Sequence, residues 1–245
     1  MSAVVESVIA GVEIVVESVI VQPAGLRGLF VTGTDTGVGK TVVSAALMHR
    51  YRSGIPLRYW KPIQTGIEQD DDTAEVERLG VCGPDELRPE GTRLRRPVSP
   101  HLAARLSGTT IALRPLVDSI VEERRSIRWI VEGAGGVLVP INDAETMIDL
   151  MSLLRLPVIV VARTALGTIN HTLLTLEALG RRALQVAGVV MVGDPDAENR
   201  AAIERYGAAV VVGEMPRFTR LDAAPLAAWA AAELDPQHRL MEWLE

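Results

Sequence analysis

Two kinds of apolar pattern alternate along most of the chain. In one kind nearly every residue is apolar, which is typical of strands buried on both faces of a sheet. These runs are Gly28–Thr32, Leu57–Ile63, Arg128–Val131, Val158–Val161, Val186–Val192 and Ala208–Val212. In the other kind apolar residues recur with the helical period, over Thr41–Arg52, Asp72–Leu79, Pro100–Leu106, Pro115–Arg125, Glu145–Leu154, Thr168–Arg181 and Ala197–Tyr206. The alternation predicts an α/β fold with a parallel sheet flanked by helices on both faces.

Residues 28–245 have the character of a single domain. They contain no Pro/Ser-rich linker and no shift in composition, and a chain of 245 residues that is 48% hydrophobic can bury a large core. Near the end, Ala223–Glu233 predicts one further surface helix and Leu240–Leu244 a short apolar tail.

Residues 1–27 form an N-terminal extension of unknown role, in which the sequence of Val4–Ile9 returns as Val15–Ile20. No basic residue precedes its apolar part, and glutamates interrupt it. We therefore expect neither a signal peptide nor a membrane span here.

The charge balance narrows the class of partner. The formal net charge is −6, whereas proteins that bind a nucleic-acid backbone usually present a basic face. We expect no nucleic-acid partner, no membrane partner, and a phosphate site that is positive only locally. Cys82 is the single cysteine, so no intrachain disulfide can form, which fits a cytoplasmic location. Its neighbours suggest a turn, and we interpret it as structural rather than catalytic.

The most informative segment runs from Gly28 to Thr41 as an apolar strand, a glycine-rich turn and a Lys-Thr pair at the head of a helix. Amide hydrogens of such a turn converge on phosphate, the lysine reaches the outer phosphates, and the hydroxyl holds Mg²⁺. The spacing is slightly irregular, because Gly33 precedes the usual glycine position, Thr34, by one residue. An ordinary turn would explain the glycines but not Lys40 beside Thr41. The sheet is therefore predicted to be of the P-loop NTPase type.

Charged residues follow the next predicted strands at their carboxyl ends, where parallel sheets collect ligands. Pro62 keeps Lys61 extended, so its ammonium group can neutralise phosphate or attract an anionic substrate. A solvated lysine beside a turn is the alternative. Among the acids at the next helix start, Asp70 and Asp71 suit helix capping, whereas Asp72 also suits Mg²⁺.

Glu132 ends a buried strand, where a carboxylate is costly unless it is paired or metal-bound, so we interpret it as a Mg²⁺ ligand. The glycines that follow it allow close approach of a ligand. Further on, Ala165–His171 opens a long helix whose amide hydrogens suit a carboxylate. We interpret His171 as a structural or supporting histidine. Without a His/Cys cluster of zinc spacing, a transition-metal site is not expected.

These segments together resemble the dethiobiotin synthetase family, in the family's order and over about residues 28 to 220. The matching segments are Val31–Thr41, Lys61–Pro62 with Thr65–Gly66, Asp72, Ser99–His101, Glu132–Gly136, Leu166–Asn170 and Gly213–Pro216. The resemblance implies a ligase of biotin biosynthesis that joins diaminopelargonate and CO₂ or bicarbonate to form dethiobiotin. ATP is then the co-substrate and Mg²⁺ the cofactor.

The resemblance also implies roles for individual residues. Lys61 and Lys40 would be catalytic, and Thr41, Asp72 and Glu132 would hold Mg²⁺. The nucleotide would contact Gly37, Val38, Gly39, Lys40, Thr41, Val42, Asp72, Glu132, Gly133, Ala134, Gly135, Pro216, Arg217 and Phe218. The substrate would contact Thr65, Gly136, Val137, Leu166, Gly167, Thr168, Ile169 and Asn170.

Family members are similar in forming homodimers, in which the segment corresponding to Leu166–Asn170 reaches the neighbouring subunit's substrate. Relatives often place Asn-Asp after the strand that corresponds to Val186–Val192, where it contacts adenine. This chain has Gly193-Asp194 there, so we predict a looser nucleotide preference.

Three other hypotheses stay open at this point. A ParA-like ATPase would act as a nucleotide switch, but such proteins usually carry a second lysine near the start of the loop, where Thr34, Asp35 and Thr36 stand. The synthetase-like half of a cobyric acid synthase would need an amidotransferase domain beyond residue 220. A degenerate family member that binds nucleotide for another purpose is the third.

Overall fold

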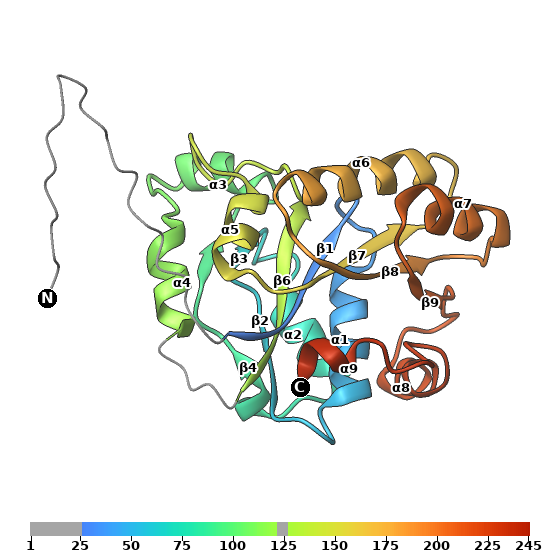
Figure 1. Ribbon diagram of the computed structural model, residues 1–245. Coiled ribbons are helices and arrows are strands. Elements are labelled where there is room, and N and C mark those ends of the chain that lie inside the picture. The colour runs from blue at the N-terminus through green and yellow to red at the C-terminus, as the bar shows by residue number, and fades with distance from the viewer. Residues whose placement is uncertain (1–25, 122–126) are drawn as a thin grey trace, which may run out of the picture.

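The computed structural model describes residues 26–121 and 127–245 and is built around one seven-stranded sheet (Figure 1). The strand order is β4-β2-β6-β1-β7-β8-β9, and every neighbouring pair is parallel. The strands are β1 Arg27–Gly33, β2 Leu57–Trp60, β4 Leu87–Arg88, β6 Arg128–Gly136, β7 Val158–Arg163, β8 Val186–Val192 and β9 Val211–Met215. A second, two-stranded sheet pairs β3 Ile63–Thr65 with β5 Thr92–Leu94.

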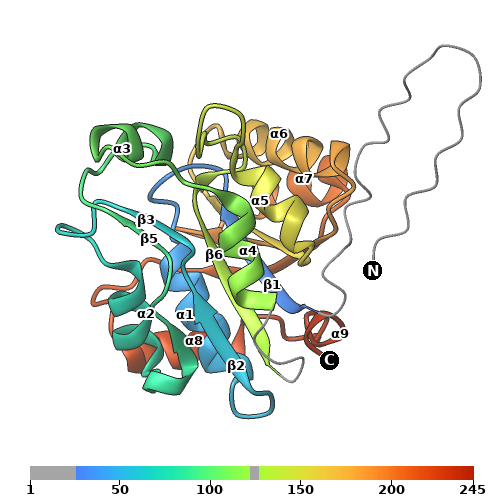
Figure 2. The ribbon, with the colours of Figure 1, turned by 90° about the vertical axis from the view of Figure 1, so that its left-hand side faces the viewer.

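Helices cover both faces of the large sheet, as Figures 1 and 2 show. One face packs against α1 Lys40–Tyr51, α2 Asp72–Gly80, α8 Ala223–Ala232 and α9 Met241–Leu244. The other packs against α3 Pro100–Leu106, α4 Leu113–Val121, α5 Met147–Leu154, α6 Thr168–Arg181 and α7 Ala197–Gly207. A short 3₁₀ helix spans Pro84–Glu86. The predicted α/β fold of P-loop NTPase type, with helices on both faces, is confirmed.

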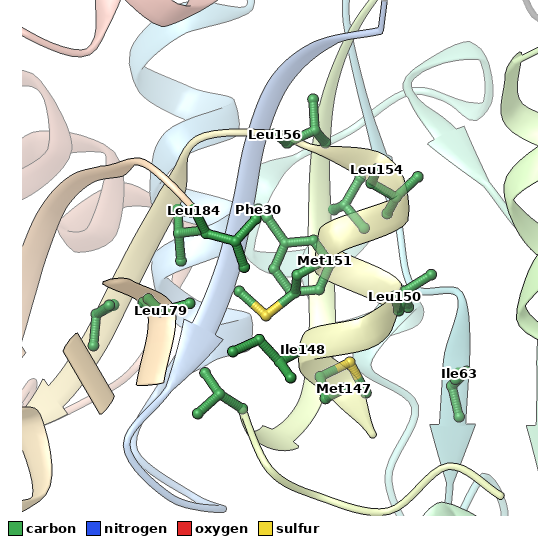
Figure 3. Packing of buried hydrophobic residues seen from close by; sticks show 14 of the residues in the cluster. Phe30, Ile63, Met147, Ile148, Leu150, Met151, Leu154, Leu156, Leu179 and Leu184 are labelled. Carbon is green, nitrogen blue, oxygen red and sulfur yellow. The ribbon is translucent and has the colours of Figure 1, made fainter. Parts of the chain in front are cut away.

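The buried strands divide their side chains between two apolar cores. On β1, Phe30 packs into the core beside α5, where Figure 3 shows its ring next to Ile148 and Met151. Its neighbours Leu29 and Val31 belong to the core beside α1. Side chains of consecutive strand residues point to opposite faces, so a central strand must be apolar at nearly every position.

Three predicted strands differ from the observed ones by three or more residues at one or both ends. The run Leu57–Ile63 is interrupted after Trp60, because Pro62 has no N–H for the ladder, and the chain resumes as β3 in the small sheet. The strand predicted at Ala208–Val212 starts later, because Ala208 adopts a left-handed conformation (φ 47°) at the end of α7. β6 continues four residues past Glu132, to Gly136, so that glutamate does not end its strand.

The helix boundaries agree with prediction to within a few residues. Thr146 caps α5 together with Asp149, which delays its start to Met147. The predicted helix Pro115–Arg125 begins earlier, at Leu113, and its last residues lie outside the described part of the chain. The repeat within residues 1–27 lies outside it too, so the separate N-terminal extension stays a prediction. In the described ranges no helix is long and apolar enough to cross a membrane.

Candidate active site

A phosphate loop joins β1 to α1. Gly37 (φ 70°) and Gly39 (φ 102°) take left-handed conformations that side chains rarely adopt, and Lys40 begins the helix. A Cβ atom on Gly33 would lie 2.7 Å from the side chain of Val38, so this early position also requires glycine. Amide hydrogens at this helix start suit an anion.

Lys61 follows β2 and is buried, with 3% of its side chain exposed. Its Nζ atom lies 2.6 Å from Oδ2 of Asp72 and 2.8 Å from Oε1 of Glu132, and it donates to the carbonyl oxygen of Gly133 at 3.0 Å. The alternative of a solvated lysine is therefore wrong. This lysine joins β2, β6 and the start of α2 at the carboxyl edge of the sheet.

Two acids at the start of α2 have different roles. Asp71 caps the helix, because its carboxylate accepts hydrogen bonds from the amides of Thr73 and Ala74. Asp72 is the first helical residue and turns instead to Lys61 and to Thr41, whose Oγ1 lies 3.0 Å from Oδ1 of the aspartate. The cap therefore leaves Asp72 available to the site.

Glu132 is fully buried in β6. Its Oε1 accepts hydrogen bonds from Lys61 at 2.8 Å and from Thr41 at 3.0 Å. Its Oε2 is contacted by Tyr59 Oη at 2.9 Å and by Ser44 Oγ at 3.1 Å. Burying a carboxylate is costly unless it has such partners.

The charges of the site shift the pKa values of its groups. Burial opposes the charged form of Lys61, but Glu132 and Asp72 outweigh burial and raise its pKa. Burial likewise opposes the charged form of Asp72, but Lys61 and Thr41 outweigh it and lower the pKa of that carboxyl. Burial, and then the charge of Lys61, lower the pKa of Lys40 to about 8. A phosphate group would oppose this loss of positive charge.

The oxygen donors fit Mg²⁺ bound together with phosphate. The Oγ1 atom of Thr41 lies 3.0 Å from both Oδ1 of Asp72 and Oε1 of Glu132. Mg²⁺ is commonly held by one or two carboxylates, with phosphate and water completing its ligands. Within the described ranges no group of three or more His, Cys, Asp or Glu residues is placed to hold a metal alone. Phosphate and water would supply the remaining ligands.

A cavity of about 890 Å³ opens over these groups. It is lined by the loop residues Gly37 and Gly39, by Lys40, Thr41, Val42, Lys61, Thr65, Asp72, Glu132, Ala134 and Gly135, and by Gln64, Gly66 and Ser99 among others. Most of the predicted nucleotide and metal residues therefore share one cavity. Val38 instead packs into the core beside α1.

A neighbouring cavity of about 490 Å³ lies between the phosphate loop, residues 136–140 and α6. Gly136 and Val137 line it, as do His171 and Leu174. The side chain of His171 is exposed, so it is not a buried structural histidine, and its interpretation as a supporting residue stays a prediction. Leu166, Gly167, Thr168, Ile169 and Asn170 lie one turn earlier, outside the lining of both cavities. Leu166 is fully exposed.

Three predicted nucleotide contacts follow β9: Pro216, Arg217 and Phe218. In the described part of the chain, none of them lines either of the two cavities. Phe218 packs against the core beside α1. The carboxyl ends of β8 and β9 do approach the loop, because a Cβ atom on Gly39 would lie 3.3 Å from the side chain of Val192. A base bound there would lie against an apolar strand end.

Two residues of the site escaped the sequence reasoning. Ser44 lies four positions after Lys40, on the same helix face, and Tyr59 lies two positions before Lys61, on the same face of the predicted strand Leu57–Ile63. Those spacings were a usable signal. Composition also indicates where the site lies. Lys40 and Lys61 are the only lysines in the sequence, and both line the larger cavity.

Comparison with known proteins agrees with this geometry. A family model described as an AAA domain matches residues 27–225. The ATP-dependent dethiobiotin synthetase BioD of Paramagnetospirillum magneticum is 48% identical, over 82% of this chain and 94% of that protein. Proteins of the same name from Agrobacterium fabrum and Rhodopseudomonas palustris are 46% and 43% identical, over 78% and 85% of this chain and 86% and 95% of those proteins.

A solved ParA family ATPase from Chlorobium tepidum superposes with a TM-score of 0.53, over 84% of this chain and 98% of that one. At 9% identity this likeness concerns the fold alone. Fold and site thus define a P-loop nucleotide-binding protein with a parallel sheet. The sequence relatives specify more, because their identity extends over most of both chains: the chain belongs to the ATP-dependent dethiobiotin synthetase family.

Proposed function

We propose that this protein forms dethiobiotin from 7,8-diaminopelargonate and CO₂ with ATP as co-substrate. It is then a cyclo-ligase of biotin biosynthesis that makes carbon–nitrogen bonds. The observation that carries the proposal is the placement of Lys61 between Asp72 and Glu132, beside a phosphate loop, in a chain 48% identical to a dethiobiotin synthetase.

The reaction has three steps. One amine of the diamine adds to CO₂ and loses a proton, which gives a carbamate. A carbamate oxygen then attacks the γ-phosphorus of ATP, the bond to the ADP oxygen breaks, and a carbamic-phosphoric anhydride forms. The second amine attacks the carbonyl carbon of this anhydride and loses a proton, phosphate leaves with the electron pair of the broken bond, and the ureido ring closes.

Phosphoryl transfer needs positioning and charge neutralisation more than a proton-transfer residue. The loop amides and Lys40 bind the triphosphate in this proposal, and Lys61 balances the charge of the carbamate and of the transferring phosphoryl group. Thr41, Asp72 and Glu132 hold Mg²⁺, which when bound neutralises charge on the β- and γ-phosphates.

The remaining parts of the proposal concern the substrate and the assembly. Thr65 contacts the diamine from the larger cavity. Two copies of the chain associate, and the helix start at Leu166–Asn170 of one subunit binds the substrate carboxylate in the site of the other. The exposure of Leu166 supports such a contact. We place the enzyme in the cytoplasm, where ATP is abundant.

Purified protein incubated with the diamine, bicarbonate, Mg²⁺ and ATP tests the activity directly. Dethiobiotin measured by mass spectrometry should appear with one phosphate per turnover. The ParA-like nucleotide switch predicts phosphate release that does not depend on the diamine, and that result would refute the ligase. Omission of bicarbonate is the matched control, because a ligase then loses product and phosphate release together.

A further inference from the structure

The two carboxylate oxygens of Glu132 have different partners. Oε1 faces the charged and metal-binding side of the site, where Lys61 and Thr41 lie 2.8 and 3.0 Å away. Oε2 faces inward, where Tyr59 and Ser44 lie 2.9 and 3.1 Å away. A carboxylate can turn about its last side-chain bond with little preference of its own. Because the two oxygens of a carboxylate are equivalent, what its partners must fix is the plane of the group, and with it the direction in which the outer oxygen points.

The hydroxyl of Ser44 has two possible acceptors for its one proton. Its hydroxyl lies 2.9 Å from the carbonyl oxygen of Lys40 as well as 3.1 Å from Oε2 of Glu132, and a hydroxyl has one proton. The shorter contact is the one within the helix. The hydrogen bond within the helix therefore competes with the hydrogen bond from Ser44 to Glu132.

The Tyr59 hydroxyl donates to Oε2 of Glu132 at 2.9 Å, and among the described residues it has no second acceptor. Its ring is fully buried in the core beside α1. A phenol hydroxyl carries one proton and a carboxylate oxygen carries none, so Tyr59 is the donor in this contact. Because β2 pairs with β6, with Tyr59 opposite Ile130, the ring approaches Glu132 from the adjacent strand.

We propose that Tyr59 is a positioning residue, whose hydroxyl holds Oε2 of Glu132 and thereby keeps Oε1 turned toward Thr41 and Lys61, where it serves Mg²⁺ bound with a nucleotide. The inference rests on the metal-site part of the proposed function but not on the ligase chemistry. Groups that orient metal-binding side chains commonly change metal affinity by one to two orders of magnitude when removed.

The Tyr59→Phe variant removes the hydroxyl and keeps the ring. Tyr51→Phe is the matched control, because Tyr51 is also buried and also donates to a carboxylate, Oδ2 of Asp235, at 2.6 Å. Tyr51 ends α1, whose first residue is Lys40, so it lies about 16 Å along the helix from the phosphate loop. Both variants lose one buried hydrogen bond, but only one of those bonds touches the site.

The probe is Mn²⁺, whose electron paramagnetic resonance signal reports binding in the presence of a non-hydrolysable ATP analogue. We expect the dissociation constant of Mn²⁺ to rise about tenfold in Tyr59→Phe and less than about twofold in Tyr51→Phe. Ser44→Ala should cause a smaller rise than Tyr59→Phe. An unchanged affinity in Tyr59→Phe, or an equal loss in Tyr51→Phe, would overturn the inference. If the protein makes no dethiobiotin but the variants show these Mn²⁺ affinities, the ligase activity is refuted and the role of Tyr59 is not.

A second measurement needs no substitution at position 59. The chain has three tyrosines, so protein labelled with 3-fluorotyrosine gives three ¹⁹F resonances, which Tyr51→Phe and Tyr206→Phe assign. Adding Mg²⁺ to the complex with the analogue should shift the Tyr59 resonance more than the Tyr51 resonance. If the Tyr59 resonance does not move, the tyrosine does not sense the metal and the inference fails.

Discussion

The Nζ atom of Lys61 lies 2.8 Å from Oε1 of Glu132, and both side chains are buried, at 3% and 0% exposure. Such a pair has lost the solvation of both ions, and their attraction must compensate for that loss. Asp72 makes a second contact with the same ammonium group, at 2.6 Å. One lysine therefore stabilises two carboxylates that would otherwise repel one another.

Lys61→Ala should reduce turnover by orders of magnitude and also destabilise the fold. The substitution leaves buried Glu132 without its cation, a change that typically costs about 3–5 kcal/mol. Urea denaturation and dethiobiotin formation measure the two effects. Because Mg²⁺ with ATP replaces part of the lost positive charge, the two together should raise the melting temperature of the variant more than that of the unmodified protein.

Lys61→Arg separates charge from geometry and is the matched control for the alanine variant. It keeps the positive charge but replaces a compact ammonium group by a planar guanidinium. Stability should recover in part while turnover remains low. Full activity in Lys61→Arg would show that charge alone suffices at this position.

The sequence was most informative where a backbone shape and a residue type are both required. Gly37, Gly39, Lys40 and Thr41 could be assigned because a phosphate loop needs left-handed turns followed by those side chains. Glu132 could be singled out because a buried acid demands a partner. These arguments are local, so they need no knowledge of the tertiary structure.

Contacts between elements were harder to predict. The spacing of Tyr59 from Lys61 places its side chain toward the site, but nothing local shows that β6 brings a carboxylate to its hydroxyl. The two-residue strand β4 at Leu87–Arg88 is too short for any periodic pattern. The sequence allowed both Asp70 and Asp71 as the cap of α2, and the observed helix start selects Asp71. Tertiary packing decided the first two cases, and the position of the helix start decided the third.

Nucleotide selectivity should be loose. The family resemblance leads us to expect Asn at the position of Gly193, but here φ is 137° and a Cβ atom would lie 2.3 Å from Oγ1 of Thr164, so this backbone cannot accept a side chain. We expect kcat/KM for GTP, CTP and UTP within roughly tenfold of the value for ATP, about the contribution of one hydrogen bond. Turnover assays with the four nucleotides check this. An equally large loss with every nucleotide other than ATP would contradict it.

The thiol of Cys82 should be unreactive in the folded protein. Burial, with a smaller contribution from Glu86, raises its pKa from 9.0 to about 11. At pH 8 iodoacetamide should therefore label the native protein at least about 100-fold more slowly than the urea-unfolded protein, since the thiolate is the nucleophile. Mass spectrometry measures both rates, and comparable rates would show that the thiol is exposed.

The raised pKa of Cys82 also predicts that the protein loses stability at alkaline pH. The folded thiol keeps its proton up to a higher pH than the unfolded thiol, so the unfolded state binds fewer protons between about pH 9 and 11. The contribution of Cys82 to stability is full below pH 9 and falls as the pH rises through this window. Cys82→Ser should reduce that part of the pH dependence of unfolding.

Substitution of Leu166 should weaken the proposed homodimer. This side chain is fully exposed just before α6, and Leu138 and Leu174, at the rim of the smaller cavity, are 64% and 55% exposed. A surface with several exposed leucines is typical of a contact site. In Leu166→Asp we expect the dimer dissociation constant to rise at least about 30-fold, as for loss of an interface hot spot. The KM for the diamine should rise with it, because the neighbouring helix start would no longer be held at the site.

Leu106→Asp is the matched control for Leu166→Asp, since Leu106 is also a leucine with a large exposed fraction, 60%, but ends α3 rather than preceding α6. Sedimentation velocity over a range of concentrations measures association, and initial rates at varied diamine concentration measure KM. Equal weakening by both substitutions would mean that added charge, not the α6 surface, disrupts the dimer. A fully active monomer would refute the shared site, because each subunit would then bind the substrate carboxylate with its own residues.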